Sequence, residues 1–210
     1  LYNNASQPEF SVGEYWDGNI NKVKAWIEST KSDNVPTSAA FDFPVRYTVR
    51  DAVNNGNWAA LDGVGLAKDP NYARYAVTFV ENHDTQPGQS LASTIESWFK
   101  PSAYALILLR EAGTPCVFWG DLFGTPETGD LPAVTELPLL MTMRRALAHG
   151  PQHDAFDDPD VVGFAREGDE AYPKNALSGM DRASLPIIGD ENWGESVLNV
   201  SVTNKGTAEV

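Results

Sequence analysis

The sequence predicts an α/β fold, and two patterns along the chain support this class. Short apolar runs alternate with amphipathic stretches up to about residue 150. Such alternation is typical of strands and helices in a parallel sheet with right-handed crossovers. Beyond that point, turn-rich segments separate two further apolar runs, and no helical pattern remains. We therefore expect four βα units followed by a small antiparallel β module.

Hydrophobic periodicity places the first two units. Val23, Trp26 and Ile27 recur at helical spacing, so this stretch is predicted to be an amphipathic helix. The glycine and aspartate residues between 56 and 69 indicate a loop. The elements predicted before this loop are a strand over 9–13, a helix over 21–31, a strand over 38–43 and a helix over 45–54.

The third and fourth units follow the loop. Pro101 suits the first turn of a helix, because its missing N–H would have no helical partner there. Pro138 lies inside the last helical pattern and indicates a kink or a late start. The elements predicted here are a strand over 75–80, helices over 91–98 and 102–112, a strand over 115–119 and a helix over 133–149.

Four βα units are half of a (β/α)8 TIM barrel, and they cannot close alone. Further strands are predicted over 161–166 and 196–202. We therefore place a domain boundary near residue 150. Residues 1–149 are expected to form a half-barrel, and residues 150–210 a small antiparallel β domain.

Composition and charge narrow the possible partners. The 210 residues include 29 acidic and 15 basic side chains, for a net charge of −14. This balance argues against nucleic acid or an anionic membrane as a partner, since phosphate contacts need Lys and Arg. No apolar run approaches the roughly 18 residues of a membrane span. The one cysteine, Cys116, excludes an intrachain disulfide and a cysteine-rich metal site.

Polar side chains gather where two predicted strands end. Glu14 follows the first strand beside Tyr15 and Trp16, and the third strand is followed by Glu81, Asn82, His83 and Asp84. The carboxyl ends of barrel strands converge on one face, so these segments are expected to share a cleft. Paired carboxylates flanked by aromatic rings and an imidazole fit the cleavage of glycosidic bonds. One carboxyl must protonate the leaving oxygen, and a glutamate beside two aromatic rings suits that role.

These two segments resemble signature segments of the α-amylase family of glycoside hydrolases. Phe10 to Trp16 resembles the segment with the general acid/base, and Phe79 to Thr85 the one with a transition-state-stabilising carboxylate. The resemblance implies that Glu14 is the acid/base and Asp84 the stabiliser. It also implies that hydrogen bonds to the sugar come from His83, Asn82 and Gln86. The sugar sites on the leaving-group side would be lined by Tyr15 and Trp16.

The resemblance to liquefying-type bacterial and related fungal members runs from residue 9 to about 170 and assigns this chain to the C-terminal half of the barrel. It implies an α-glucan as partner, a monomer, and calcium whose main ligands lie outside this chain. The family's nucleophile is an aspartate with Arg before it and Lys-His after it, and no such segment occurs here. Residues 172–195 are also shorter than the corresponding part of the family's β domain.

Three functions follow from these observations. The leading hypothesis is a retaining, endo-acting hydrolase of α-1,4-glucosidic bonds in starch or glycogen, with its nucleophile outside this chain. An α-glucan transglycosylase or an exo-acting relative would use the same residues. A non-catalytic α-glucan-binding or scaffold protein would account for the missing nucleophile. Because starch is large and insoluble, we expect a secreted protein.

Other polar side chains are expected to have mainly structural roles. His149 and His153 lie near the C-terminal end of a helix, where the helix dipole stabilises a protonated imidazole. Asp42 and Arg46 are expected to pack at the end of the second strand or to serve outer sugar sites. Asp121 follows a strand and is expected to cap a helix or line the cleft. A solvated turn is favoured over a calcium site for the acidic residues Asp154, Asp157, Asp158 and Asp160.

Overall fold

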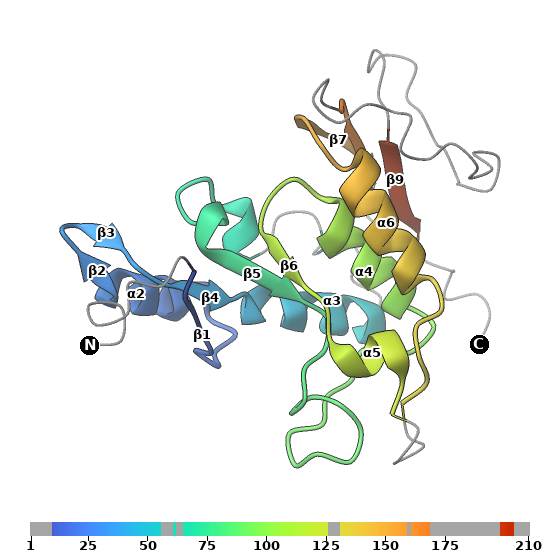
Figure 1. Ribbon diagram of the computed structural model, residues 1–210, viewed down its shortest axis with the longest axis horizontal. Coiled ribbons are helices and arrows are strands. Elements are labelled where there is room, and N and C mark those ends of the chain that lie inside the picture. The colour runs from blue at the N-terminus through green and yellow to red at the C-terminus, as the bar shows by residue number, and fades with distance from the viewer. Residues whose placement is uncertain are drawn as a thin grey trace.

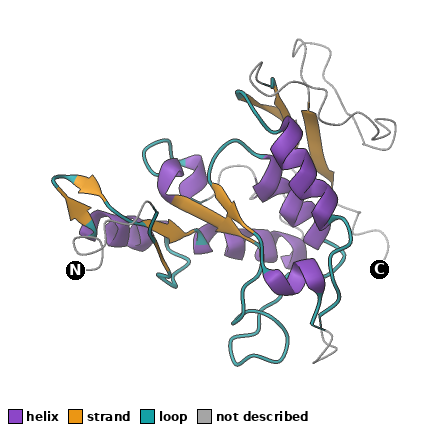
Figure 2. Ribbon diagram, in the orientation of Figure 1, coloured by secondary structure: helices purple, strands orange, loops and turns teal. Residues whose placement is uncertain are grey.

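The structure is a computed structural model that describes residues 10–55, 61, 65–125, 131–158, 161–168 and 198–203. It consists of a parallel sheet with helices around it and a separate antiparallel sheet near the C-terminus (Figure 1; Figure 2). Among the described helices, none has the length and apolar character that crossing a bilayer requires. Residues 56–60 and 62–64 of the loop predicted over 56–69, the stretch 172–195 and Asp160 lie outside the described residues.

Four strands form the parallel sheet, which confirms the predicted α/β class. They are β1 (Val12–Gly13), β4 (Ala39–Phe41), β5 (Ala76–Phe79) and β6 (Thr114–Cys116), paired in the order of the chain. Neighbouring strands are parallel, with Val12 opposite Ala39, Ala40 opposite Ala76 and Val77 opposite Thr114. All residues of β5 are buried, which explains its continuous apolar sequence.

Four of the described helices, α2, α3, α4 and α6, lie close to where the sequence predicts them, whereas the short α5 was not predicted. The side chain of Asn19 caps α2, whose apolar face buries Val23 and Ile27. Pro138 lies in the first turn of α6, so the proline marks a late start and not a kink. The helices are α2 (Ile20–Ser29), α3 (Phe43–Asn55), α4 (Lys100–Leu109), α5 (Trp119–Phe123) and α6 (Leu137–Leu147), with 3₁₀ turns η2 (Leu66–Lys68) and η3 (Ala73–Tyr75).

Two apolar clusters hold these elements together. The larger surrounds α4 and includes Val49 of α3, Leu137 of α6 and Phe164 of the C-terminal sheet. The smaller lies under α2 and contains Val23 and Ile27 with small residues of β4 and β5. Helices α2, α3 and α6 therefore bury their apolar faces against the sheet or against α4, as the sequence periodicity requires.

The C-terminal sheet has three antiparallel strands, β7 (Gln152–Asp158), β8 (Val161–Arg166) and β9 (Leu198–Thr203). The two strands predicted here are confirmed, whereas the acidic turn expected for the region of β7 is wrong. The Arg166 guanidinium donates 2.9 Å to the Leu109 carbonyl and 2.6 Å to the Gly150 carbonyl, which ties this sheet to the end of α4. The division into two domains stays a prediction.

Two local predictions differ from the structure. No helix forms over 91–98, because side chains from elsewhere take its backbone groups: Glu81 accepts from the Ile95 N–H and Arg46 donates to the Ser93 carbonyl. The hairpin of β2 (Lys31–Ser32) and β3 (Val35–Pro36) was not expected. Its turn residues Asp33 and Asn34 have positive φ angles of 51° and 64°, and this Asp-Asn pair is a turn signal in the sequence.

The close approach of β1 and α2 depends on a glycine. A Cβ added to Gly13 would overlap the ring of Trp26. We expect Gly13→Ala to lower the free energy of unfolding by about 1–3 kcal/mol, measured by urea denaturation, because the ring has to move. In a Trp26→Leu background the same change should cost less. Equal costs in the two backgrounds would contradict this contact.

Candidate active site

The two candidate segments meet at the carboxyl ends of β1 and β5. Asn82 Nδ2 donates a hydrogen bond of 3.3 Å to Glu14 Oε1, across 68 positions of sequence. The segments that follow β1, β5 and β6 all emerge on the lower side of the sheet in Figure 1. The structure therefore brings Glu14 and the Asn82 segment to one edge of the sheet.

The side chain of Asn82 is held from both of its ends. Its Oδ1 accepts from the backbone N–H groups of Asp84 at 3.0 Å and Thr85 at 2.9 Å. The backbone N–H of Asn82 donates a hydrogen bond of 3.0 Å to the Thr85 hydroxyl. Because Oδ1 faces two donors, Nδ2 must point the other way, toward Glu14. Asn82 thus fixes both the turn that carries Asp84 and the direction of Glu14.

His83 and Asp84 lie together at the surface of this turn. His83 Nε2 is 3.6 Å from Asp84 Oδ2, and the two side chains are 73% and 39% exposed. Gln86 Nε2 donates 3.0 Å to the His83 carbonyl, which braces the turn from the other side. The imidazole and the carboxylate are therefore open to a ligand while their backbone is restrained.

The predicted aromatic lining residues are half-buried and anchored. The Trp16 indole N–H donates to the Tyr47 hydroxyl, and its ring lies 4.6 Å from the ring of Phe43. Tyr15 stacks on Trp26 with ring centroids 6.2 Å apart. The anchoring gives both rings a fixed position beside Glu14, and their contact with a sugar stays a prediction.

Glu81 has a different role from its polar neighbours, because it is buried beneath them. Its Oε1 lies 3.4 Å from Arg46 Nη2 and accepts 2.8 Å from the Ile95 N–H, and Oε2 accepts 2.7 Å from the Thr85 hydroxyl. Burial raises the pKa of Glu81, although Arg46 opposes this shift. Burial also lowers the pKa of Arg46. For both groups, the loss of hydration shifts the pKa more than the ion pair shifts it back, which is characteristic of buried ion pairs.

Arg46 holds both ends of the loop that contains the site. Its Nε donates 3.3 Å to the Val80 carbonyl at the end of β5, and its Nη1 donates 3.0 Å to the Ser93 hydroxyl. Nη2 also bonds the Ser93 carbonyl. Of the two roles expected for Arg46, the structure shows packing. Its position on the apolar face of α3, among Val45, Val49 and Ala52, is the sequence signal for a buried cation.

Asp42 is buried at the end of β4, and its carboxylate accepts hydrogen bonds from backbone N–H groups. It accepts 3.3 Å from the Val45 N–H and 3.1 Å from the Ala67 N–H. The close approach of this loop requires Gly65, whose φ is +87° and whose Cβ would press on Asp42. Burial raises the pKa of Asp42 to about 6, against the lowering by its backbone hydrogen bonds.

Asp121 ties α4 to the helix that follows β6. Its two carboxylate oxygens accept from Lys100 Nζ and the Tyr104 hydroxyl, each at 2.6 Å, and all three side chains are buried. Burial, with the negative charge of Asp121, raises the pKa of Tyr104. Asp121 thus neither caps a helix with its side chain nor lines a cleft, and sequence reasoning missed its two partners.

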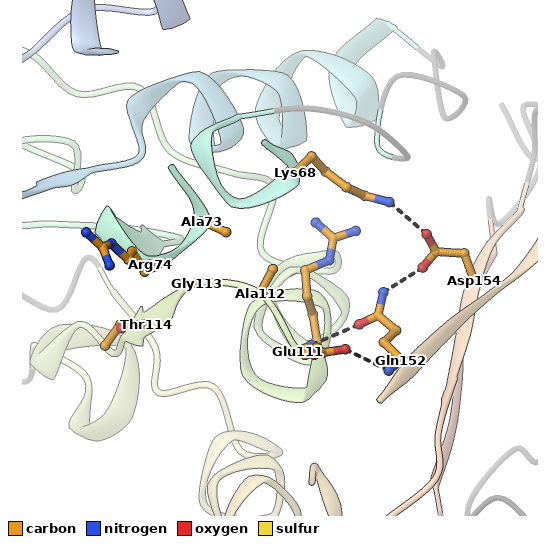
Figure 3. A pocket seen from close by; sticks show the side chains of 10 residues that line it. Lys68, Ala73, Arg74, Glu111, Ala112, Gly113, Thr114, Gln152 and Asp154 are labelled. Carbon is orange, nitrogen blue, oxygen red and sulfur yellow. Dashed lines mark hydrogen bonds and ion pairs between the residues drawn. The ribbon is translucent and has the colours of Figure 1, made fainter. Parts of the chain in front are cut away.

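One cleft lies at the other end of the sheet. Its volume is about 600 Å³, and its lining includes Arg74, two residues before β5 begins, and Thr114, the first residue of β6. Across it, a chain of bonds links Lys68, Asp154, Gln152 and Glu111 (Figure 3). Parallel sheets carry their chemistry at the carboxyl ends, so this cleft is not the candidate active site.

The remaining candidates have protein partners. The His149 ring bonds the Arg145 carbonyl at 2.8 Å, and His153 pairs with Glu167. Asp154 lies 2.9 Å from Lys68. In the part of the chain that the structure describes, no three His, Cys, Asp or Glu side chains come together as a metal site would need.

Comparison with known proteins gives consistent relatives, although no family model matches the chain. The chain is 38% identical over 199 residues to the α-amylase of Bacillus licheniformis, and 39% identical over 212 residues to that of Geobacillus stearothermophilus. It is also 31% identical over 211 residues to a glucan 1,4-α-maltohexaosidase of a Bacillus species. These matches cover 89%, 97% and 96% of this chain, but only 38%, 38% and 39% of the relatives.

Solved structures show the same fold. A cyclomaltodextrin glucanotransferase, CldA, superposes on 78% of this chain with a TM-score of 0.54 at 18% identity, covering 37% of its own length. The cyclic α-maltosyl-(1→6)-maltose hydrolase of Arthrobacter globiformis superposes on 80% of this chain with a TM-score of 0.51 at 20% identity, covering 41% of its own length. At these identities the likeness establishes the fold alone.

Removal of the buried cation tests the role of Arg46. We expect Arg46→Met to cost about 3–5 kcal/mol of unfolding free energy, because Glu81 is left buried without its partner. The double change Arg46→Met/Glu81→Gln should cost less, since it removes the stranded charge and keeps an acceptor for Ile95. Urea denaturation measures the double variant and both single variants, with Arg50→Met, a half-buried arginine on the same helix, as a control. A double variant as unstable as the sum of its single changes would contradict the pairing.

The buried Asp42 makes stability depend on pH. The pKa of Asp42 is about 6 in the folded chain, against an ordinary 3.8. Its contribution to the free energy of unfolding is therefore complete below pH 3.8 and is lost as pH rises through about 6. Relative to Asp42→Asn, the unaltered chain should lose about 2.4 kcal/mol of unfolding free energy between pH 4 and pH 7. Denaturation of both proteins across this range measures the difference, with Asp51→Asn as a surface control. A difference that does not change with pH would contradict this assignment.

Proposed function

Because the chain is a homologue of the α-amylase family of glycoside hydrolases, we propose that it carries two catalytic carboxylates of a retaining, endo-acting hydrolase of α-1,4-glucosidic bonds in starch or glycogen. Glu14 is the general acid/base and Asp84 stabilises the transition state. The observation that carries this proposal is the 3.3 Å hydrogen bond from Asn82 to Glu14, which holds both segments at one sheet edge.

The proposed reaction uses these residues in order. Glu14 protonates the glycosidic oxygen while an aspartate outside this chain attacks the anomeric carbon, which forms a glycosyl–enzyme intermediate. Glu14 then takes a proton from water, and that water releases the sugar with its configuration retained. Asp84 carries a negative charge next to the positive charge that develops on the sugar ring. The exposed ring of His83 is placed to bond sugar hydroxyls.

The proposed architecture is the C-terminal half of a (β/α)8 barrel. Two observations support it: the four parallel strands follow the order of the chain, and β1 and β6 form the two outer edges of the sheet. Closure would then need strands beyond this chain, and the chain spans 38% of the length of its bacterial relatives. Residues 150–210 would form the C-terminal β domain. The family implies calcium, but among the described residues no three His, Cys, Asp or Glu side chains gather as a metal site, so no step is assigned to it.

An exo-acting relative is the second candidate. It is favoured by the 31% identity to a maltohexaosidase, whose name indicates products of one length. Both candidates use the same acid and stabiliser and differ in which bond of the glucan enters the site. Chromatography of products after a short digestion separates them: a spread of oligosaccharides indicates endo action, and one dominant product indicates exo action.

Substitution of the two carboxylates tests the proposal in a starch-cleaving protein that contains this chain. Glu14→Gln and Asp84→Asn are each expected to lower kcat on soluble starch by about 10²–10⁴-fold, because acid catalysis or charge stabilisation is lost. The surface variant Glu136→Gln is the control and should retain full activity. An undiminished rate for Glu14→Gln would exclude it as the acid. A change confined to KM in Asp84→Asn would indicate simple binding.

The chain by itself gives a second test. The 22.9 kDa polypeptide is expected to bind maltoheptaose without hydrolysing it, because the nucleophile is supplied from outside the chain. Reducing-sugar release and calorimetry measure the two properties. Hydrolysis by this polypeptide at the rate of a complete enzyme would show that the nucleophile lies within it.

A further inference from the structure

Tyr47, on α3, contacts the segment that contains the proposed acid. The indole N–H of Trp16 donates a hydrogen bond to the Tyr47 hydroxyl, across 31 positions of sequence. Two residues farther along, a Cβ added to Gly18 would lie 2.9 Å from the Tyr47 ring. The segment from Glu14 to Gly18 follows β1, whereas α3 follows β4, so one tyrosine joins the loops of two neighbouring strands.

The ring of Tyr47 is fixed by its own helix. Phe43, one turn earlier on α3, has its ring centroid 6.1 Å from that of Tyr47. Arg50, three residues later, places its guanidinium carbon 4.9 Å from the Tyr47 ring centroid, which is a cation–π contact. Side chains three and four positions apart are neighbours on a helix, so α3 itself restrains the direction of the hydroxyl. The Trp16 indole therefore meets an acceptor that is already ordered.

The preceding residue of α3 holds the other catalytic segment. Arg46 is buried and donates a hydrogen bond of 3.0 Å to the Ser93 hydroxyl, in the loop that contains Asp84. Tyr47 accepts its hydrogen bond from the segment that contains Glu14. Consecutive residues of one helix thus bond the two segments whose carboxylates have to act on the same glycosidic bond.

We propose that Tyr47 is a positioning residue for the general acid. This inference rests on the proposed function. By accepting the hydrogen bond from Trp16, Tyr47 fixes the segment after β1 and with it the direction in which the Glu14 carboxyl meets the glycosidic oxygen. Tyr47 acts through the protein and not through a contact with sugar. The placement matters because proton transfer needs the two heavy atoms within about 3.2 Å, and small displacements of an acid slow the reaction steeply.

Aryl maltotriosides test this role, because their leaving groups have similar rings and differ mainly in acidity. In a starch-cleaving protein that contains this chain, Tyr47→Phe removes only the hydroxyl. It should lower kcat/KM for release of phenol from phenyl α-maltotrioside roughly tenfold, because phenolate needs a proton to leave. With 4-nitrophenyl α-maltotrioside, kcat/KM should stay within about twofold, since nitrophenolate leaves with little help from the acid.

Tyr72→Phe is the matched control. The Tyr72 hydroxyl donates 3.2 Å to Glu28 near the end of α2, so this change removes a tyrosine hydroxyl that is bonded elsewhere and should alter neither value. The ratio of kcat/KM between the two substrates does not depend on how much of the protein is folded. A purely structural role of Tyr47 would therefore leave that ratio unchanged.

A double change tests the route through Trp16. Trp16→Phe keeps a ring and removes the indole donor. In this background, Tyr47→Phe should lower kcat/KM for phenyl α-maltotrioside by less than about twofold, because the hydrogen bond is already lost. A tenfold loss in both backgrounds would overturn the route through Trp16.

The outcomes separate this inference from the function on which it rests. If Tyr47→Phe loses equally on both substrates, or on neither, while Glu14→Gln is inactive on starch, the positioning role is wrong and the proposed function stands. If Glu14→Gln cleaves starch at an undiminished rate, the proposed acid fails and the positioning role fails with it. A loss confined to the phenyl substrate supports both.

Discussion

The candidate site depends on one buried ion pair, between Arg46 of α3 and Glu81 at the end of β5. Neither side chain is exposed. Burial removes the hydration of each charge, and the ion pair alone does not make up for that loss. The surrounding hydrogen bonds use the remaining polar atoms: Arg46 holds Val80 and Ser93, and Glu81 holds Ile95 and Thr85. The pair therefore specifies the path of the loop from 81 to 95 and with it the place of Asp84.

Above this pair, the exposed residues are ordered by their own backbone. Thr85 contacts buried Glu81 on one side and the turn at Asn82 on the other, so it transmits the position of the ion pair to the surface. Asn82 then reaches across to Glu14. After the outer strand β6, Asp121 fixes α5 in the same way, through Lys100 and Tyr104. Buried polar groups thus hold the loops at the carboxyl end of the sheet, and solvent-facing groups above them are left for ligand.

The sequence predicts the repeating part of this design well. Apolar periodicity located the four parallel strands, and the Glu14 and Asp84 segments were recognised because polar residues directly follow strands. It did not separate Glu81 from its neighbours, since a buried acid and an exposed acid look alike until the partner Arg46 is placed. The helix expected over 91–98 does not form for the same reason. Its periodicity is a local signal, whereas Glu81 and Arg46, far away in the sequence, form hydrogen bonds with its backbone.

The central claim is that Glu14 and Asp84, brought together over the Arg46–Glu81 pair, act on one bound α-glucan. Carbon-13 spectra of the side-chain carboxyl groups, recorded while maltoheptaose is added, test this most directly. The account predicts that the Glu14 and Asp84 signals move together and saturate with one Kd, while the exposed carboxyl of Asp51 does not move. Movement of only one of the two signals, or saturation at clearly different concentrations, would contradict a shared site.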